Sequence, residues 1–590
     1  MQDPQKFYAQ QLKRYKEQAQ QLKRQSLRLS VLRVLVFLVT AVLIYFFYHH
    51  TLAATLTGIC GVILFVCLLS IHENLRQKRQ LTQRLVLLNI EEQNIARGDY
   101  THRPQGNLFL EAGHSYAHDI DLFGKGSFFQ YLNRTGLREG TAALAALLNS
   151  NNLDGIADKQ RALAELAQIP EWMQRYTAIA QGLKTDEEAS KVLHWITHYK
   201  RFLKPVIRFL CMGFGLSSVL ILGLTVLQLI PPSILGYWIL FGLGITSLYL
   251  KRVNALAVKS SKAKEFFRQY TLLLDAIENQ PFKANLLRQW QMQIRSEGDK
   301  ASAIFKKFSK ALDALDHRNN LIAAVLGNGL FLWDLVQSYR IEAWLGHYGD
   351  KAEDWFKVVS TFDAYNSLGT FAFNHQDFNY PQLVDHEILI KAEGLGHPLI
   401  APEKRICSDL YINETNFFIV TGANMAGKST FLRAVALHII MANLGLPVCA
   451  QKSSYKPIKL ISSMRTSDSL AEESSYFFSE LTRLKFIVDQ LQNDRYFVIL
   501  DEILKGTNST DKAIGSKQFV KRLVSLKACG IIATHDLSLT AIDEEEQGVK
   551  NYFFDAQIKD DELYFDYKLK AGVCQNMNAS FLLRKMGIVE

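Results

Sequence analysis

The amino-acid sequence predicts an α/β domain at the carboxy-terminal end of the chain, preceded by a mainly α-helical region with four transmembrane helices in two hairpins. Three observations lead to this fold class. Short apolar strands that end in polar residues recur late in the chain, helical spacing of apolar residues dominates before them, and four long stretches are almost free of charge. The 590 residues are also too many for one compact core.

Composition and charge limit the kinds of partner. The net charge of +10 favours anionic partners, either nucleic acid or acidic lipid headgroups, and charge alone does not distinguish the two. The seven cysteines form no Cys-x-x-Cys pair and no Cys/His cluster with the spacing of a metal site. This usage fits a reduced, cytosol-facing protein better than a disulfide-stabilised secreted one, and it does not predict a structural metal.

Four stretches are apolar for about the length that crosses a bilayer as a helix, on the order of 20 residues. They cover residues 29–48, 52–71, 206–229 and 234–250. Residues 49–51 separate the first pair, and residues 230–233, which include two prolines, separate the second. Each pair is therefore predicted to form a transmembrane hairpin. Buried core helices are the alternative, but they rarely reach this length without polar residues.

Basic residues flank both hairpins, and neither turn contains one. They are Lys13, Arg14, Lys16, Lys23, Arg24 and Arg28 before the first hairpin, Arg76, Lys78, Arg79 and Arg84 after it, Lys200, Arg201 and Lys204 before the second, and Lys251 and Arg252 after it. The positive-inside rule then predicts a multi-pass protein of the cell (inner) membrane, with the amino terminus and both large soluble stretches in the cytoplasm. Residues 1–28 are predicted to be a basic helix that attracts anionic lipid or, as we favour, is simply solvated beside the membrane.

A strand predicted at 417–420 leads into a glycine-containing loop and then a helix over 431–442. This order, with the pattern Gly-x-x-x-x-Gly-Lys-Ser, is typical of a phosphate-binding loop, because its backbone N–H groups close around phosphate oxygens and the helix amino terminus favours negative charge. Lys428 is expected to reach the β- and γ-phosphates of ATP, and Ser429 to bind Mg²⁺. The predicted nucleotide-binding residues are Gly422, Ala423, Asn424, Met425, Ala426, Gly427, Lys428, Ser429 and Thr430.

Two further predicted strands end in groups that suit nucleotide hydrolysis. The strand at 496–500 ends in Asp501 and Glu502, and the strand at 530–533 is followed by Thr534 and His535. Asp501 is expected to bind Mg²⁺, Glu502 to orient or deprotonate the attacking water, and His535 to sense the γ-phosphate. One such group alone is often a helix cap. Three such groups at the ends of three successive strands of one parallel sheet predict a catalytic set of Lys428, Glu502 and His535.

Four segments resemble motifs of the MutS family. They are residues 421–430, similar to T-G-P-N-M-x-G-K-S-T; residues 475–480, similar to S-T-F-x-x-E; residues 501–509, similar to D-E-L-G-R-G-T-S-T; and residues 533–535, which match A-T-H. The Asn424-Met425 pair is far more diagnostic than the general phosphate-loop pattern. The likeness is strong over 395–590 and looser over 107–200 and 251–380.

The resemblance implies a helical core and lever arms joined to an ABC-type P-loop ATPase domain that uses ATP and Mg²⁺. It implies a homodimer through the ATPase domains, with Ser475 belonging to the nucleotide site and acting across the dimer. The predicted divisions are a basic juxtamembrane helix (1–28), the first transmembrane hairpin (29–73), the first part of the helical core (74–204), the second hairpin (205–250), a helical lever or clamp region (251–384) and the ATPase domain (385–590).

Several positions depart from the family pattern. Ala423 replaces a proline of the phosphate loop, and Leu504 replaces a glycine after the carboxylates, so the local turn there is open to change. Arg405 lies near where the family commonly has an aromatic residue against adenine, which suggests that Arg405 stacks on the base instead. The separate α/β domain with which mismatch sensors of the family begin has no counterpart before the first hairpin.

The lever region carries basic residues that suit a DNA backbone, in line with the family's clamp. They are Lys259, Lys262, Lys264, Arg268, Lys283, Arg288, Arg295, Lys306, Lys307 and Lys310. Phosphate contact with double-stranded DNA is one interpretation, and a solvated helix face with interleaved acids is the other.

Two functions of different classes remain. The first is a membrane-anchored, dimeric, ATP-driven clamp on double-stranded, including mismatched, DNA in a repair-type role. The second is an ATP-driven membrane scaffold or remodelling module whose partners are the lipid bilayer and an unidentified protein. An ABC transporter is less favoured, because the chain has no L-S-G-G-Q signature.

Overall fold

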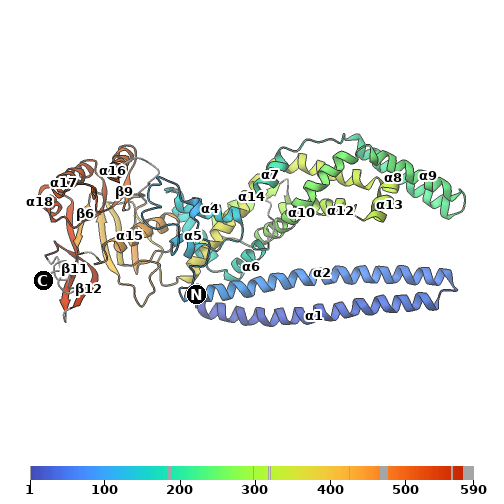
Figure 1. Ribbon diagram of the computed structural model, residues 1–590, viewed down its shortest axis with the longest axis horizontal. Helices are drawn as coiled ribbons and strands as arrows, with labels where there is room; N and C mark the ends of the chain where they lie inside the picture. Colours follow the sequence, from blue (N-terminus) through green and yellow to red (C-terminus); the bar gives the residue numbers. More distant parts are fainter. Residues whose placement is uncertain are drawn as a thin grey trace.

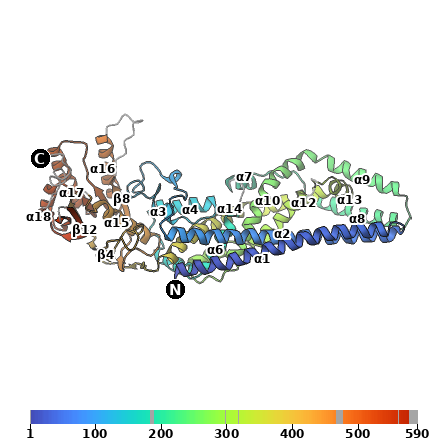
Figure 2. The same cartoon turned by 60° about the horizontal axis from the view of Figure 1, so that its bottom comes forward.

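The computed structural model describes residues 2–182, 189–296, 298–316, 318, 320–423, 425–464, 476–559 and 562–575. The molecule is elongated, with an α/β domain at one end, a helical core in the middle and two helical arms at the other end (Figure 1). Both arms leave the core in the same direction, which the second view confirms (Figure 2). The amino terminus lies at the foot of the first arm, beside the core.

A six-stranded sheet in the order β12-β11-β6-β10-β9-β8 forms the centre of the α/β domain. Its strands are β6 (Phe417–Gly422), β8 (Lys459–Ser463), β9 (Tyr496–Asp501), β10 (Cys529–Ala533), β11 (Val549–Lys559) and β12 (Glu562–Ala571), and only β12 runs antiparallel to its neighbour. All six residues of β6 are buried, as expected for a central parallel strand covered on both faces. Its helices are α15 (Lys428–Asn443), α16 (Tyr476–Asn493), α17 (Ser509–Ser525), the 3-10 helix η3 (Leu537–Ala541) and α18 (Ile542–Glu545).

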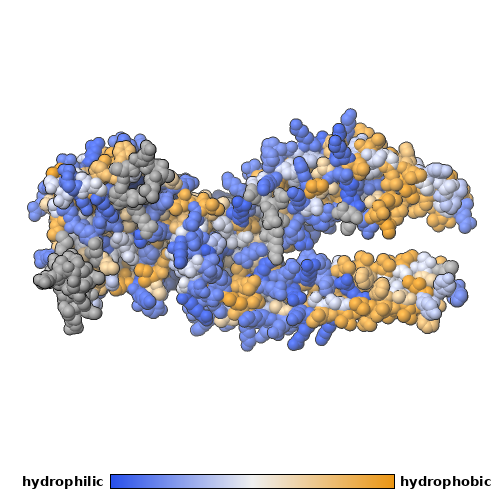
Figure 3. All heavy atoms as spheres, viewed as in Figure 1, coloured by the Kyte–Doolittle hydropathy of each residue, from blue (hydrophilic) through white to orange (hydrophobic). Residues whose placement is uncertain are grey.

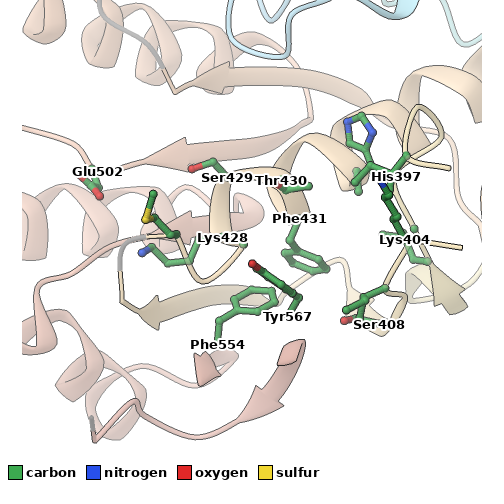
Figure 4. A pocket seen from close by; sticks show the side chains of 17 residues that line it. His397, Lys404, Ser408, Lys428, Ser429, Thr430, Phe431, Glu502, Phe554 and Tyr567 are labelled. Carbon is green, nitrogen blue, oxygen red and sulfur yellow. The ribbon is translucent and has the colours of Figure 1, made fainter. Parts of the chain in front are cut away.

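A second, four-stranded sheet adjoins the first in the order β3-β7-β4-β5. Its strands are β3 (Gln382–Leu383), β4 (Ile388–Leu395), β5 (Ser408–Asn413) and β7 (Lys452–Tyr455). The loop between β4 and β5 reaches the amino end of α15, so this sheet forms one wall of the site described below (Figure 4).

The helical core is organised around α14 (Trp333–Asn374), a helix of 42 residues. The surrounding elements are η1 (Asn107–Phe109), α3 (Phe128–Leu132), α4 (Arg138–Asn149), α5 (Ile156–Leu166), α6 (Pro170–Ala180), α7 (Ala189–Thr197), α10 (Leu250–Glu278), α11 (Asn285–Gln293), α12 (Ala301–Asp316) and the short strands β1 (Arg295–Ser296) and β2 (Asp299–Lys300). The carboxylate of Asp363 on α14 accepts the backbone N–H groups of Gly136 and Leu137 at 3.0 and 2.8 Å, which ties α14 to the start of α4. Burial raises the pKa of Asp363 to about 7.

The first arm is an antiparallel pair of helices, α1 (Pro4–Phe46) and α2 (Thr51–Ala96). Each helix is about twice as long as its predicted span, because it continues without a break from the apolar segment into the core. At the core end, Phe7 packs edge-to-face on Phe373 of α14, and the Tyr8 hydroxyl donates to the Asn374 side chain at 2.7 Å. The predicted boundary near residue 28 therefore separates two parts of a single helix.

The second arm contains α8 (Val206–Val226), α9 (Pro232–Ser247) and a third apolar helix, α13 (Leu321–Phe331). Helix α13 lies within residues 251–384, which were predicted as one helical lever or clamp region. It packs on α9 so closely that a Cβ at Gly242 would lie 2.4 Å from the Gly329 carbonyl oxygen. The helix pairs α9–α10 and α13–α14 bend by 71° and 81° at their junctions.

Away from the core, the surface of both arms is largely apolar, whereas it is more polar near the core (Figure 3). None of the most apolar 18-residue window of α1 is buried, and 17% of that of α8 is. In the described part of the chain, three helices are long and apolar enough to cross a membrane, or up to five segments if each bent pair counts as one.

Candidate nucleotide-binding site

The loop between β6 and α15 surrounds the Lys428 ammonium group, whose Nζ donates to the carbonyl oxygens of Gly422 at 2.8 Å and Ala423 at 3.0 Å. The loop needs glycine at two positions. Gly422 has φ 147° and Gly427 has φ 100°, and a Cβ at Gly422 would lie 2.7 Å from the Phe554 carbonyl oxygen. Burial lowers the pKa of Lys428. A phosphate group at this helix amino terminus would compensate the buried ammonium.

Ser429 and Asp501 meet at the carboxyl ends of β6 and β9. The Ser429 hydroxyl donates to Asp501 Oδ2 at 2.6 Å. Burial raises the pKa of Asp501, so a nearby cation would favour its ionised form. Among the described residues no group of three or more His, Cys, Asp or Glu side chains converges as a metal site. The Ser–Asp pair instead fits Mg²⁺, which typically takes one or two protein oxygens and completes its shell with substrate phosphates and water.

Glu502 and His535 form a close pair at the ends of β9 and β10. His535 Nε2 lies 2.6 Å from Glu502 Oε1, and 3.5 Å from Lys428 Nζ. The hydrogen bond from His535 is the largest cause that lowers the pKa of Glu502 to about 2, and Lys505 and Lys428 add to it. Glu502 is therefore a carboxylate at neutral pH, and it is better suited to orienting a water molecule than to holding a proton.

Glu480 of α16 holds the turn that follows these carboxylates. Its buried carboxylate accepts the backbone N–H groups of Leu504 at 2.5 Å and Lys505 at 3.0 Å. Leu504 has φ 59°, a left-handed conformation that is uncommon for a residue with a large side chain. Leu504 thus adopts the left-handed turn conformation that a glycine would be expected to adopt, and Glu480 accepts a hydrogen bond from the backbone N–H group of Leu504. Glu480 belongs to residues 475–480, which the MutS resemblance expects to act across the dimer, and its bonds to this turn were not predicted.

A cavity of about 500 Å³ extends from the loop toward the second sheet. It is lined by Lys428 and Ser429 at one end and by His397, Phe431, Phe554 and Tyr567 farther along (Figure 4). Tyr567 comes from β12 and lies against Gly427, where an added Cβ would be 3.0 Å from its ring. Its aromatic face beside the phosphate-binding loop suits a nucleobase.

Arg405 does not line this cavity, contrary to the sequence-based hypothesis. Its Nε and Nη2 both donate to the Ile400 carbonyl oxygen, at 3.0 and 2.9 Å, and its guanidinium lies over Phe378. The side chain is held inside its own loop, so Tyr567 is the better candidate for contact with the base.

The structure brings most of the predicted residues together. The described members are Gly422, Ala423, Met425, Ala426, Gly427, Lys428, Ser429, Thr430, Asp501, Glu502 and His535, all at the carboxyl ends of β6, β9 and β10 or in the adjoining loop. Asn424 and Ser475 lie outside the described residues.

Comparisons with known proteins agree with this geometry. The family model of MutS domain V matches residues 418–583. The chain is 35% identical to human "MutS protein homolog 4" over 237 residues, which is 38% of this chain and 25% of that protein. It is 31% identical to "DNA mismatch repair protein MutS" of Persephonella marina over 259 residues, 42% of this chain and 29% of that protein. The chain therefore spans only about a quarter of the length of the curated relatives it matches.

The match covers the phosphate-binding loop, both carboxylates and His535. Residues 418–583 match MutS domain V, which is an ABC-type ATPase domain that uses ATP and Mg²⁺, and the protein is therefore an ATP hydrolase.

Proposed function

We propose that this protein is a membrane-anchored, MutS-related ATPase that works as a dimeric clamp on double-stranded DNA in a repair-type role. The observation that carries the proposal is the direct connection of the two ends of the molecule. A nucleotide site lies at one end, apolar arms lie at the other, and α14 with the helices packed on it joins them. Three of the similar proteins bear the name of DNA mismatch repair proteins, which supports DNA as the partner.

The roles that we assign follow from the contacts of each group. Lys428 would bind the terminal phosphates, in place of its bonds to Gly422 and Ala423. Ser429 and Asp501 would hold Mg²⁺, which neutralises phosphate charge when bound. Glu502 would orient the attacking water once His535 has turned from it toward the γ-phosphate.

Exposed apolar residues near the site support a dimer of ATPase domains. Met425 in the phosphate-binding loop is 82% exposed, and Ile514 on α17 is 54% exposed. A second copy of the domain that covers the site would bury both side chains. Completion of the site by a partner accords with the role proposed for Ser475.

The arms support the membrane location. Apolar residues face outward over α1, α2 and α8, each of which is long enough to cross a bilayer, whereas α9 reaches that length only together with α10. The basic residues cluster at the core ends of the arms. We place α1–α2 and α8–α9 across the inner membrane, with the core and the ATPase domain in the cytoplasm.

The DNA surface has weaker support than the ATP site. Some of the basic residues predicted to contact DNA are paired with acids: Lys264 lies 2.8 Å from Asp313, Arg268 2.9 Å from Glu265, and Lys307 3.6 Å from Asp299. We therefore assign DNA contact chiefly to Lys306 and Lys310 on the exposed face of α12.

The test is the ATPase rate of the purified full chain in nanodiscs, with no DNA, homoduplex, mismatched duplex or single-stranded DNA, and with Lys428→Ala as the blank. Duplex DNA is expected to change the rate severalfold, with the effect weakening as salt rises. An identical rate under all four conditions contradicts the DNA part of the proposal.

A second candidate is a membrane scaffold or remodelling module that does not use DNA. The third apolar helix, α13, favours this second candidate, because it adds an exposed apolar surface to the second arm. Leu321 and Ile322 are 78% and 70% exposed. ATPase stimulation by liposomes or by a membrane protein, together with indifference to DNA, is the result that would select this candidate.

A further inference from the structure

A concave basic surface lies at the base of the α8–α9 hairpin, where the chain enters and leaves the apolar arm. The cavity there has a volume of about 560 Å³. Five of its lining residues are cations: Lys200, Arg201 and Lys204 precede α8, and Arg252 and Lys259 lie on α10. No aspartate or glutamate lines it.

These five cations have no ion-pair partner among the described residues. Lys264 farther along α10 differs, since it lies 2.8 Å from Asp313. One buried carboxylate lies beneath the cavity, that of Glu342 on α14, and it is already engaged. It accepts the Tyr199 hydroxyl at 2.9 Å and the backbone N–H groups of Phe202 and Leu203 at 2.9 and 3.0 Å. Glu342 thus fixes the loop that presents three of the cations.

The cavity also has an apolar part that continues onto the arm. Phe202, Leu203 and Leu256 line it, and the next residues along the chain expose apolar side chains. Val206 is 69% exposed and Phe209 is 66% exposed on the first turn of α8. A ligand that fits this surface has a negatively charged head and an apolar tail.

We propose that this cavity binds the headgroup of an anionic phospholipid, with the phosphate among Lys200, Lys204 and Arg252 and the acyl chains along α8. This site rests on the proposed membrane location of the arm. A duplex would need cations in an extended row, whereas these five surround one concave site beside an apolar helix. Basic pockets at the cytoplasmic ends of membrane helices commonly bind acidic headgroups.

The experiment compares two triple variants of the full chain in detergent. The pocket variant is Lys200→Gln/Lys204→Gln/Arg252→Gln. The control is Lys23→Gln/Arg24→Gln/Arg28→Gln, which removes the same charge from exposed positions of α1 before the first apolar stretch. Arg201 is left intact because its guanidinium occupies the space above Gly346 of α14. Native mass spectrometry measures the apparent Kd for phosphatidylglycerol, with phosphatidylcholine, inorganic phosphate and a short DNA duplex as the other probes.

The wild type is expected to bind one phosphatidylglycerol in preference to phosphatidylcholine. The pocket variant should weaken this binding roughly tenfold or more, and the control less than about twofold. Equal losses in both variants would mean diffuse surface charge and would overturn the site. Binding of inorganic phosphate or duplex with similar affinity would overturn the lipid assignment.

Carbonate extraction of the same variants from cell membranes separates this proposal from the one it rests on. If the protein resists extraction while the pocket and control variants lose phosphatidylglycerol binding equally, the result contradicts the lipid site alone. Wild-type protein that carbonate releases contradicts the membrane location and the lipid site together.

Discussion

Every residue of β6 at the nucleotide end of the molecule is buried, whereas no residue in the most apolar window of α1 is buried at the other end. Both segments consist mainly of large apolar residues, so composition alone does not distinguish them. The sheet covers its apolar residues with helices, and the arms leave theirs to be covered by something outside the chain. This difference is the physical basis for assigning the two ends to water and to lipid.

The largest expected effect is a loss of ATP hydrolysis that leaves membrane retention unchanged. Lys428→Ala should lower the ATPase rate by about a hundredfold or more, because it removes the ammonium group aimed at the terminal phosphates. The fraction of protein that resists carbonate extraction should not change. Lys452→Ala, an exposed lysine on β7 that contacts Glu393, is the control and should keep the wild-type rate.

A charge placed on the arm should affect membrane retention and not ATP hydrolysis. Leu220 on α8 is 63% exposed, and Leu220→Arg would put a cation in the hydrocarbon at a cost of about 2.5–3.5 kcal/mol. Membrane retention should fall while the ATPase rate per folded molecule is preserved. Leu537→Arg, at a 38% exposed leucine of the ATPase domain, is the matched control. Equal tolerance at both positions would mean that the arm faces water, where such changes cost within about 0.5 kcal/mol.

Glu480→Gln tests how the nucleotide end holds its carboxylates. The amide offers one acceptor where the carboxylate binds two backbone N–H groups, so we expect a loss of about 1–3 kcal/mol in the stability of the turn. The kcat should fall about tenfold with little change in KM, because Glu502 precedes this turn. Asp489→Asn, on the same helix and ion-paired with Lys485, should leave kcat unchanged. A change confined to KM would contradict the positioning role.

Tyr567→Ala should have a smaller effect. Loss of an aromatic face from a nucleobase typically costs on the order of 1 kcal/mol or more, so KM for ATP should rise about fivefold at nearly constant kcat. Tyr567→Phe should behave as the wild type, since it keeps the aromatic ring. An unchanged KM in the alanine variant would place the base elsewhere in the cavity.

The smallest effect concerns pH. The pKa of Glu502 is lowered from 4.5 to about 2, so its ionised form stabilises the folded state above pH 4.5, and this contribution is lost as the pH falls toward 2. The difference in melting temperature between wild type and Glu502→Gln should therefore be constant above about pH 5 and shrink below it. A difference that stays constant down to pH 2 would contradict the lowered pKa of Glu502.

The two ends also differ in how far the sequence predicted them. The phosphate-binding loop and the ends of β9 and β10 lie together as the sequence predicted, because motifs of fixed spacing mark these segments, and the roles of their residues stay predictions. Tyr567 was missed because it belongs to an edge strand with no motif, far from the loop in sequence. The hypothesis for Arg405 was wrong, because an alignment position does not show that the guanidinium turns back to the Ile400 carbonyl.

At the arm end, hydropathy located the apolar parts of α1, α2, α8 and α9 but did not show where their helices end. It also missed α13, whose 11 residues are shorter than a span and lie in a region interpreted from its basic residues. Its place against α9 depends on a close contact between Gly242 and Gly329, which only the tertiary structure reveals.

The native cysteines allow the most direct test of the central claim. Cys60 and Cys67 are exposed on the first arm, and Cys407 is exposed on the ATPase domain. Intact membranes opened to the cytoplasmic side are treated with a water-soluble maleimide, and each peptide is quantified by mass spectrometry. We predict modification of Cys407 and protection of Cys60 and Cys67, because thiolates do not form in hydrocarbon. Equal modification of all three cysteines would contradict a bilayer around the arm.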